Sequence, residues 1–150
     1  MVKKTIVTIR TAELSDAATL ATLAGELGYP ATTAEMKRRL ELLRNNGHHE
    51  IFVAECGTLL GWIHVSLVET LETESFAEIR GLIVTEAQRG SGIGAKLVAK
   101  AEHWAGTKEC NRIRVRTNIV RAEAHSFYKK LGYISKKTQD VFDKVLPSGA

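Results

Sequence analysis

Apolar and polar residues alternate at the start of the chain. Between Thr5 and Arg10, Val7 and Ile9 lie on one side of an extended backbone, which predicts a half-buried strand. The apolar residues then recur at every third or fourth position instead of every second. Two helices are therefore expected before the next strand.

The two predicted helices have recognisable ends. Ser15 and Asp16 offer N-cap chemistry to the first helix, and Gly28 stops it. The second helix begins at Thr32, which has capping-box spacing to Glu35, and it stops at an Asn-Asn-Gly break. The apolar positions at helical spacing are Ala17, Leu20, Leu23, Ala24 and Leu27 in the first helix and Met36, Leu40 and Leu43 in the second.

Alternation returns in the middle of the chain. Residues 51–56 and 59–68 flank a turn at Gly57 and predict a hairpin, and residues 76–85 predict a further strand. Residues 113–117 alternate apolar side chains with arginines, which predicts a strand with one solvated face. Helices are expected after the glycines at 90–94 and at 124–131, and two last strands between Tyr133 and Leu146. The predicted order is one strand, two helices, three strands, a helix, a strand, a helix and two strands.

Composition places this pattern in a globular protein. With 150 residues, of which 44% are hydrophobic and 25% charged, we expect a single domain over residues 1–150. The apolar runs are short and no signal-peptide pattern is present, so a cytoplasmic protein without a membrane partner is expected. The net charge of +4 favours an anionic ligand, but the lysine pairs are too short to indicate nucleic acid.

Metal and disulfide chemistry are not expected. Cys56 and Cys110 are too few and too far apart for a disulfide framework or a zinc site, and His48 and His49 lack a third ligand at metal spacing. An isolated histidine on a helix or strand is more often structural than catalytic. A structural role is therefore expected for His64, His103 and His125.

A glycine-rich stretch separates a predicted strand from a predicted helix. Gly90, Gly92 and Gly94 follow the strand and open the helix. Where side chains are missing, phosphate oxygens can approach the backbone, the unpaired N–H groups of the first helical turn and the positive end of the helix dipole. Arg89 adds a guanidinium suited to phosphate, and Lys96 adds another positive charge.

Other glycine-loop families fit this stretch poorly. A Walker loop requires Ser or Thr after Gly-Lys, whereas Ala95-Lys96-Leu97 occurs here. A Rossmann fingerprint would lie too far along the chain to leave room for the doubly wound fold. A tight turn without a ligand is the remaining alternative, although alternate glycines at the start of a helix cost stability.

Two motifs resemble the GNAT acetyltransferase superfamily. Leu-x-Val followed by Arg-Gly-x-Gly-Ile-Gly, ending at Gly94, closely resembles its motif A. The run Ala124-His125-Ser126-Phe127-Tyr128-Lys129-Lys130-Leu131-Gly132-Tyr133 is similar to its second signature. The resemblance implies an α+β fold with a mixed central sheet of about seven strands, the first four antiparallel, flanked by four helices. It also implies a V-shaped cleft between strands 4 and 5.

The same resemblance implies acetyl-coenzyme A as donor and, from the family alone, a homodimer. The residues it assigns to the donor are Leu82, Ile83, Val84, Arg89, Gly90, Ser91, Gly92, Ile93, Gly94, Ala95, Asn118 and Arg121. Many members carry asparagine where this chain has Arg121. The variant with Asn118 and Arg121 looks like a subgroup of small-molecule acetyltransferases that includes aminoglycoside and aminoalkylphosphonate enzymes.

Two residues are candidates for proton transfer. By resemblance Tyr128 inherits the role of the acid that protonates the departing thiolate, and its alternative is a core aromatic beside Phe127. An amine acceptor must lose a proton before it attacks, and Glu78 is the candidate base on the strand that leads to the glycines. Its alternative is a structural ion pair with Arg80 or Arg114.

These observations favour an N-acetyltransferase that transfers acetyl to the primary amine of a small molecule by direct attack. A protein acetyltransferase, acting on lysine or on an N-terminus, is the runner-up within the enzymes. Outside them, a coenzyme A sensor without turnover and a basic nucleic-acid-binding module remain alternatives. The second of these would be expected to carry interleaved exposed aromatic residues, and most aromatics here occupy core-like positions.

Overall fold

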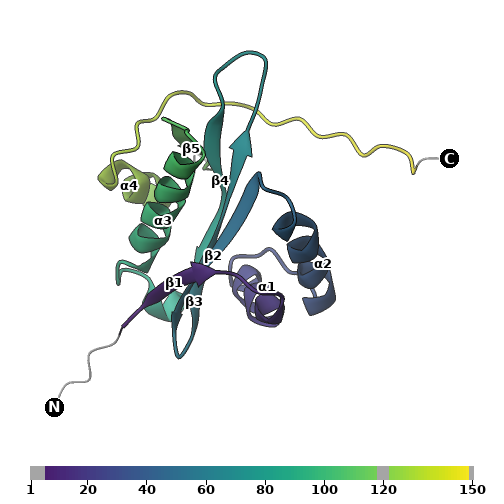
Figure 1. Cartoon of the computed structure of the whole chain (residues 1–150), viewed down its shortest axis with the longest axis vertical. Helices are drawn as coiled ribbons and strands as arrows, with labels where there is room; N and C mark the ends of the chain where they lie inside the picture. The colour runs from purple at the N-terminus through teal and green to yellow at the C-terminus, as the bar shows by residue number, and fades with distance from the viewer. Residues whose placement is uncertain (1–5, 118–121, 149–150) are drawn as a thin grey trace. The chain divides into compact units, whose positions relative to one another are not determined.

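The computed structural model describes residues 6–117 and 122–148. It divides into two compact units, residues 1–116 and 117–150, which are described separately. The first contains β1 (Thr8–Thr11), α1 (Ala17–Glu26), α2 (Thr33–Arg44), β2 (His49–Cys56), β3 (Thr58–Val68), β4 (Phe76–Val84), α3 (Ile93–Thr107) and β5 (Ile113–Val115). It also has short 3-10 helices at Leu14–Asp16 and Glu86–Gln88, and the second unit contains α4 (Ala122–Lys130) (Figure 1).

The first unit is built on a mixed five-stranded sheet with the order β1-β2-β3-β4-β5. β1 to β4 pair with their neighbours in antiparallel fashion, and β5 lies parallel to β4. A parallel neighbour requires a crossover, and α3 supplies it. The expected α+β class with a mixed sheet and four helices is therefore confirmed.

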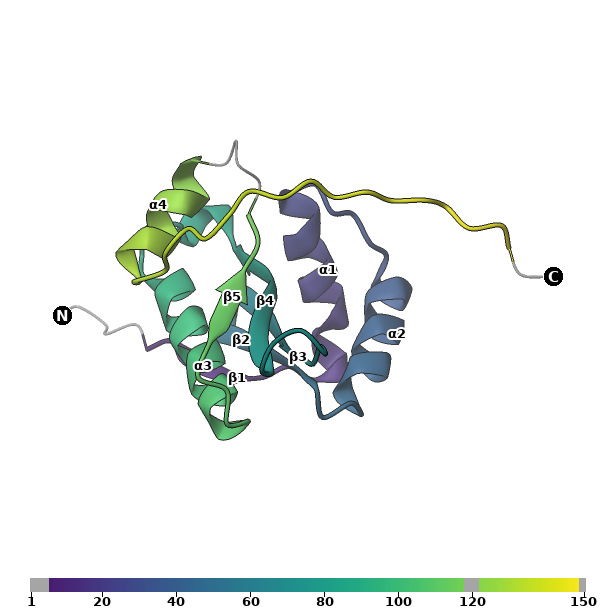
Figure 2. The same ribbon diagram turned by 90° about the horizontal axis from the view of Figure 1, so that it is seen from above.

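The helices of this unit cover both faces of the sheet. Figures 1 and 2 show α1 and α2 on one side and α3 on the other. On the α1 and α2 side the core contains Leu20, Leu40, Ile51 and Val53. The buried residues of α3 recur at helical spacing and are Ile93, Leu97, Val98, Ala101, Trp104 and Ala105.

Helix ends follow the sequence signals in part. The expected capping box of α2 is present, because Glu35 N donates to Thr32 Oγ1 at 3.0 Å and Thr32 N donates to Glu35 Oε1 at 2.9 Å. Asp16 precedes α1 as expected but caps it with no side-chain hydrogen bond. Its carboxylate instead accepts from Arg10 Nη1 at 2.8 Å, and Arg10 lowers the pKa of Asp16.

The C-terminal prediction is wrong in the structure. Two strands were expected between Tyr133 and Leu146, which would have completed a sheet of seven, but the described residues contain five strands and none of them lies there. A strand is stable only where its backbone groups pair with a neighbour, and these residues make no such ladder. Their large apolar side chains are exposed: Ile134, Val141, Phe142, Val145 and Leu146.

β3 and β4 leave no room for a side chain at Gly61. A Cβ there would lie 2.6 Å from the carbonyl oxygen of Ile83 and 3.3 Å from a methyl group of Leu97. Gly61→Ala is therefore expected to lower the free energy of unfolding by about 1–3 kcal/mol, measured by urea denaturation. Gly25→Ala is the control, because a Cβ at this position of α1 meets nothing within 4 Å and should stabilise the helix. Equal stability of the Gly61 variant and the wild type would contradict the close packing.

Two histidines pair across β2 and β3. His49 Nδ1 lies 2.9 Å from His64 Nε2, and burial, with smaller effects of His49 and Arg80, lowers the pKa of His64 from 6.5 to about 4. Between pH 6.5 and pH 4, His64 therefore binds a proton in the unfolded chain but not in the folded chain. The contribution of His64 to the free energy of unfolding is complete above pH 6.5 and is lost as the pH falls toward 4.

His64→Gln removes this titration and keeps a polar side chain. The free energy of unfolding of the wild type should fall relative to that of the variant by up to about 3 kcal/mol between pH 7 and pH 4. Urea denaturation of both proteins across this range measures the difference. Parallel curves for the two proteins would show that His64 titrates alike in the folded and unfolded chains.

Candidate functional site

The end of β4 leads directly into the glycine loop and α3. Gly90 and Gly92 have φ values of +84° and +87°, in the left-handed region that favours glycine. Gly92 is the N-cap of α3 and provides no side-chain hydrogen bond. The amides of Ile93, Gly94 and Ala95 therefore have no acceptor within the helix.

Space is open above this helix end. A Cβ added at Gly90 or Gly92 would meet nothing within 4 Å, so the glycines are required by backbone conformation and leave the approach clear. Unpaired amides, the positive end of the dipole of α3 and an open approach fit a phosphate group. The residues present thus fit the pyrophosphate of a coenzyme A donor.

The loop is tied back to the end of β4. Arg89 Nε donates to the carbonyl oxygen of Val84 at 3.4 Å, and the hydroxyl of Ser91 donates to the carbonyl oxygen of Gln88. The side chains of Arg89 and Lys96 are exposed. Both charges are therefore available at the same edge as the uncapped amides.

β4 has a partner along one edge and only a short partner along the other. It pairs with β3 over its whole length, but with β5 only from Ala77 to Ile79. In the described residues the β5 edge of β4 has no ladder from Arg80 to Val84. Backbone groups of Leu82 to Val84 can therefore accept a ligand there, while the side chain of Ile83 is buried against Leu23 and Ala24 of α1.

A polar cluster lies on β3 and β4, within the same sheet. The side chain of Glu78 is only 6% exposed, and its Oε1 accepts from Arg80 Nη1 at 3.0 Å and lies 3.4 Å from Arg116 Nε. Arg80 Nε donates to Ser66 Oγ at 2.8 Å, and Ser66 is fully buried opposite Glu78. Arg80 and Arg114 were expected as structural ion-pair partners of Glu78, and Arg80 makes this contact.

Arg114 makes a different contact. Its guanidinium lies 4.6 Å from the centre of the Phe76 ring, and that of Arg112 lies 4.5 Å from it. Both are cation–π distances. The arginines of the predicted solvated strand face therefore differ, because Arg112 and Arg114 stack on Phe76 whereas Arg116 turns to Glu78.

Sequence reasoning missed Ser66 and the pairing of His49 with His64. A signal was available, since His64 and Ser66 are two polar residues on one face of an otherwise apolar strand. Burial also lowers the pKa of His49, with a further effect of Arg80. Burial therefore disfavours the charged form of both histidines beside Arg80.

The second unit contains Tyr128 in an aromatic cluster. Its ring centre lies 5.0 Å from that of Phe127 and 5.5 Å from that of Tyr133, both in edge-to-face geometry. These contacts are of the kind that the core alternative for Tyr128 expects. Asn118 and Arg121, the other residues assigned near this signature, lie outside the described residues.

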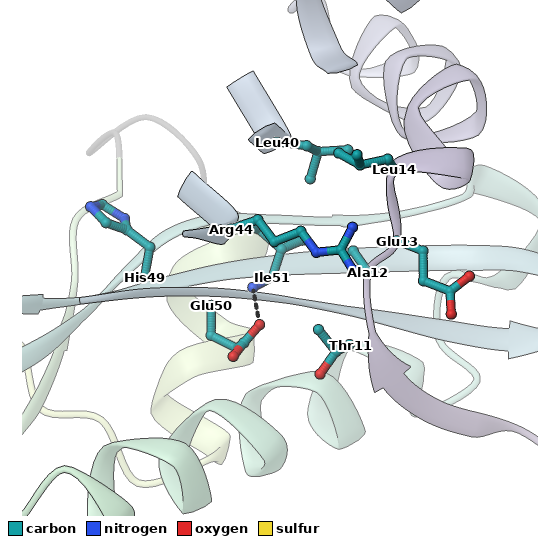
Figure 3. Close-up of a pocket in the computed structure, with 9 residues that line it drawn as sticks. All are labelled: Thr11, Ala12, Glu13, Leu14, Leu40, Arg44, His49, Glu50 and Ile51. Atoms are coloured by element: carbon teal, nitrogen blue, oxygen red, sulfur yellow. Dashed lines mark hydrogen bonds between the residues drawn. The ribbon is translucent and has the colours of Figure 1, made fainter. Parts of the chain in front are cut away.

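A small cavity elsewhere in the first unit does not fit a substrate. It lies between α2 and the start of β2, and Figure 3 shows Leu40 and Arg44 over Glu50 and Ile51. Its volume of about 20 Å³ suits a single water. Among residues 6–117 and 122–148, no group of three His, Cys, Asp or Glu could hold a metal, and no helix is long and apolar enough to cross a membrane.

Comparison with known proteins identifies relatives of this chain. Aminoalkylphosphonate N-acetyltransferase of Salmonella typhimurium is 33% identical over 106 residues, which cover 70% of this chain and 67% of that protein. Aminoglycoside N(6')-acetyltransferase type 1 of Serratia marcescens is 25% identical over 105 residues, covering 66% of this chain and 72% of that protein.

Solved structures share the fold over nearly the whole chain. A putative acetyltransferase from Agrobacterium tumefaciens has a TM-score of 0.81 at 25% identity and covers 91% of this chain and 99% of its own. Glucosamine-6-phosphate N-acetyltransferase from Arabidopsis thaliana has a TM-score of 0.79 at 24% identity, covering 92% and 98%. The model of the Acetyltransferase (GNAT) family matches residues 15–133. The chain therefore belongs to the GNAT family and is an acyl-CoA-dependent N-acetyltransferase.

Proposed function

We propose that this enzyme acetylates the primary amine of a small molecule with acetyl-coenzyme A as donor. The observation that carries the proposal is the uncapped, glycine-lined start of α3 at the end of β4. Relatives whose names specify aminoalkylphosphonate and aminoglycoside substrates support a small-molecule acceptor. The fit of the loop to a pyrophosphate supports the donor.

The donor would be held by backbone groups more than by side chains. The amides of Gly90 to Ala95 and the guanidinium of Arg89 would bind its phosphates. The unpaired edge of β4 at Leu82, Ile83 and Val84 would hydrogen-bond the rest of the donor. An N–H there would also stabilise negative charge that develops on the acyl oxygen. Asn118 and Arg121 are proposed as further contacts.

When bound, acetyl-coenzyme A supplies the acetyl group as a thioester. Glu78 would take the proton of the amine, directly or through a water. Its carboxylate is held in place for this task by the guanidinium groups of Arg80 and Arg116. Tyr128 would return a proton to the departing sulfur, and the amine would attack without an acyl-enzyme stage.

Donor binding predicts a stabilised fold. At a hundredfold excess over its dissociation constant, acetyl-coenzyme A should add about 2.7 kcal/mol to the free energy of unfolding, seen as a higher Tm. Gly92→Val should abolish this shift, because it strains the left-handed backbone and fills the phosphate approach. The control is Gly57→Val in the β2–β3 turn, where φ is +72° and a Cβ likewise meets nothing within 4 Å.

The two glycine variants share a similar backbone strain, so only the effect on the donor separates them. The Gly57 variant should melt lower than the wild type and still gain stability from the donor. A full donor-induced shift in the Gly92 variant would show that the loop is merely a turn. An unmoved wild-type Tm would remove the proposed donor site.

Proton transfer is tested by Glu78→Gln and Tyr128→Phe. Glu78→Gln should lower kcat most near pH 7 and recover part of it at alkaline pH, because an amine with a pKa of about 10.4 then supplies its own free base.

Tyr128→Phe should lower kcat by roughly ten- to a thousandfold while the affinity for the donor changes little. Turnover per donor-competent enzyme is measured from pH 6 to pH 10.

The alternatives for both residues give different results. A purely structural Glu78 would lower the Tm on substitution and leave the shape of the pH–rate profile unchanged. A purely packing role for Tyr128 would leave kcat unchanged in the phenylalanine variant, provided that chemistry limits the rate.

A further inference from the structure

The cluster around Glu78 carries more positive than negative formal charge. Two guanidinium groups, from Arg80 and Arg116, contact the buried carboxylate of Glu78. One negative and two positive charges leave the cluster with a net charge of +1. Burial lowers the pKa of the neighbouring His49 and His64 and so disfavours further positive charge on either ring.

Nearby residues strengthen the positive field. Arg114 is the cross-strand partner of Glu78 on β5, and Arg112 directly precedes that strand. Both stack on the ring of Phe76, which attracts them through its face but does not cancel their charge. The face with Arg80, Arg114 and Arg116 therefore favours anions, whereas Arg112 shares a surface pocket with Glu74.

The guanidinium groups contact a buried carboxylate and are themselves partly exposed. Glu78 and Ser66 are buried, whereas the side chains of Arg80 and Arg116 are 45% and 56% exposed. Arg80 donates through Nε to Ser66 and through Nη1 to Glu78, which fixes the orientation of its guanidinium. Nη2 takes part in neither hydrogen bond. A planar donor group fixed in this way is pre-organised for an oxyanion.

We infer that Arg80, assisted by Arg116, binds an oxyanion group of the acetyl acceptor. This inference rests on the proposed function and narrows the acceptor to amines that carry a phosphonate, phosphate or carboxylate. Because Arg80 contacts the proposed base directly, at 3.0 Å, the amine and the acid must lie close together in the acceptor. At ordinary hydrogen-bond lengths a spacer of about two or three carbons satisfies both ends. Acceptors with several ammonium groups are disfavoured by the same charges.

The experiment compares acceptors that differ only in the acid. We would measure kcat/KM for 2-aminoethylphosphonate, 3-aminopropanoate and propylamine with the wild type and with R80Q. The wild type should prefer the two acidic amines by roughly tenfold or more, since a hydrogen bond to a charged group is worth about 1.5–3 kcal/mol. R80Q should lose most of this preference.

Two further variants control for charge and folding. Arg39→Gln removes the same charge from an exposed position of α2 and should keep the preference for acidic amines. R80K keeps a positive charge beside Glu78 but not the planar fork, and it should retain part of the preference. If R80Q melts too low to assay, R80K against the wild type carries the same comparison.

Binding is measured apart from turnover, by titrating 2-aminoethylphosphonate into the enzyme saturated with coenzyme A. Equal affinities for wild type and R80Q would overturn the oxyanion site, and so would equal kcat/KM for propylamine and the acidic amines. Either result leaves the proposed acetyltransfer intact. Tighter binding by the wild type without turnover of any amine would support the oxyanion site and refute the small-molecule acetyltransfer.

Discussion

The carboxylate of Glu78 is almost entirely withdrawn from water, and its charge has to be balanced where it lies. A buried charge without a partner costs several kcal/mol, whereas one with good hydrogen bonds is tolerated. Arg80 and Arg116 provide the balance, and the buried hydroxyl of Ser66 orients Arg80. The orientation of each group therefore depends on the others, which makes the cluster a rigid feature of the sheet.

Strand β4 carries Glu78 and leads at its end into the glycine loop. β3 pairs along the whole of β4, whereas β5 pairs with it only from Ala77 to Ile79. Glu78 lies inside the doubly paired part, where burial is possible. Val84 lies in the singly paired part, where an edge stays open before the loop begins. One strand thus supplies both a desolvated carboxylate and an accessible backbone.

Local signals made most of this fold predictable. The capping box at Thr32, the hairpin turn at Gly57 and the glycine loop depend on neighbours within a few residues, and the structure contains each where the sequence placed it. The cluster around Glu78 depends on cross-strand register, which the sequence does not state, so only its contact with Arg80 was anticipated. The prediction of two C-terminal strands was wrong for a related reason. An apolar pattern favours a strand, but a strand forms only where another strand offers an edge to pair with. The roles of Tyr128 and Glu78 remain predictions.

The proposed base and the proposed oxyanion site share Arg80, which links the charge of the acceptor to its deprotonation. An acid placed near an amine stabilises the ammonium form of that amine, so such an acceptor needs a base more than a simple alkylamine does. On the proposed arrangement, the oxyanion competes with Glu78 for the guanidinium of Arg80. When the oxyanion draws on Arg80, the contact with Arg116 would keep the buried carboxylate of Glu78 from being left without a partner.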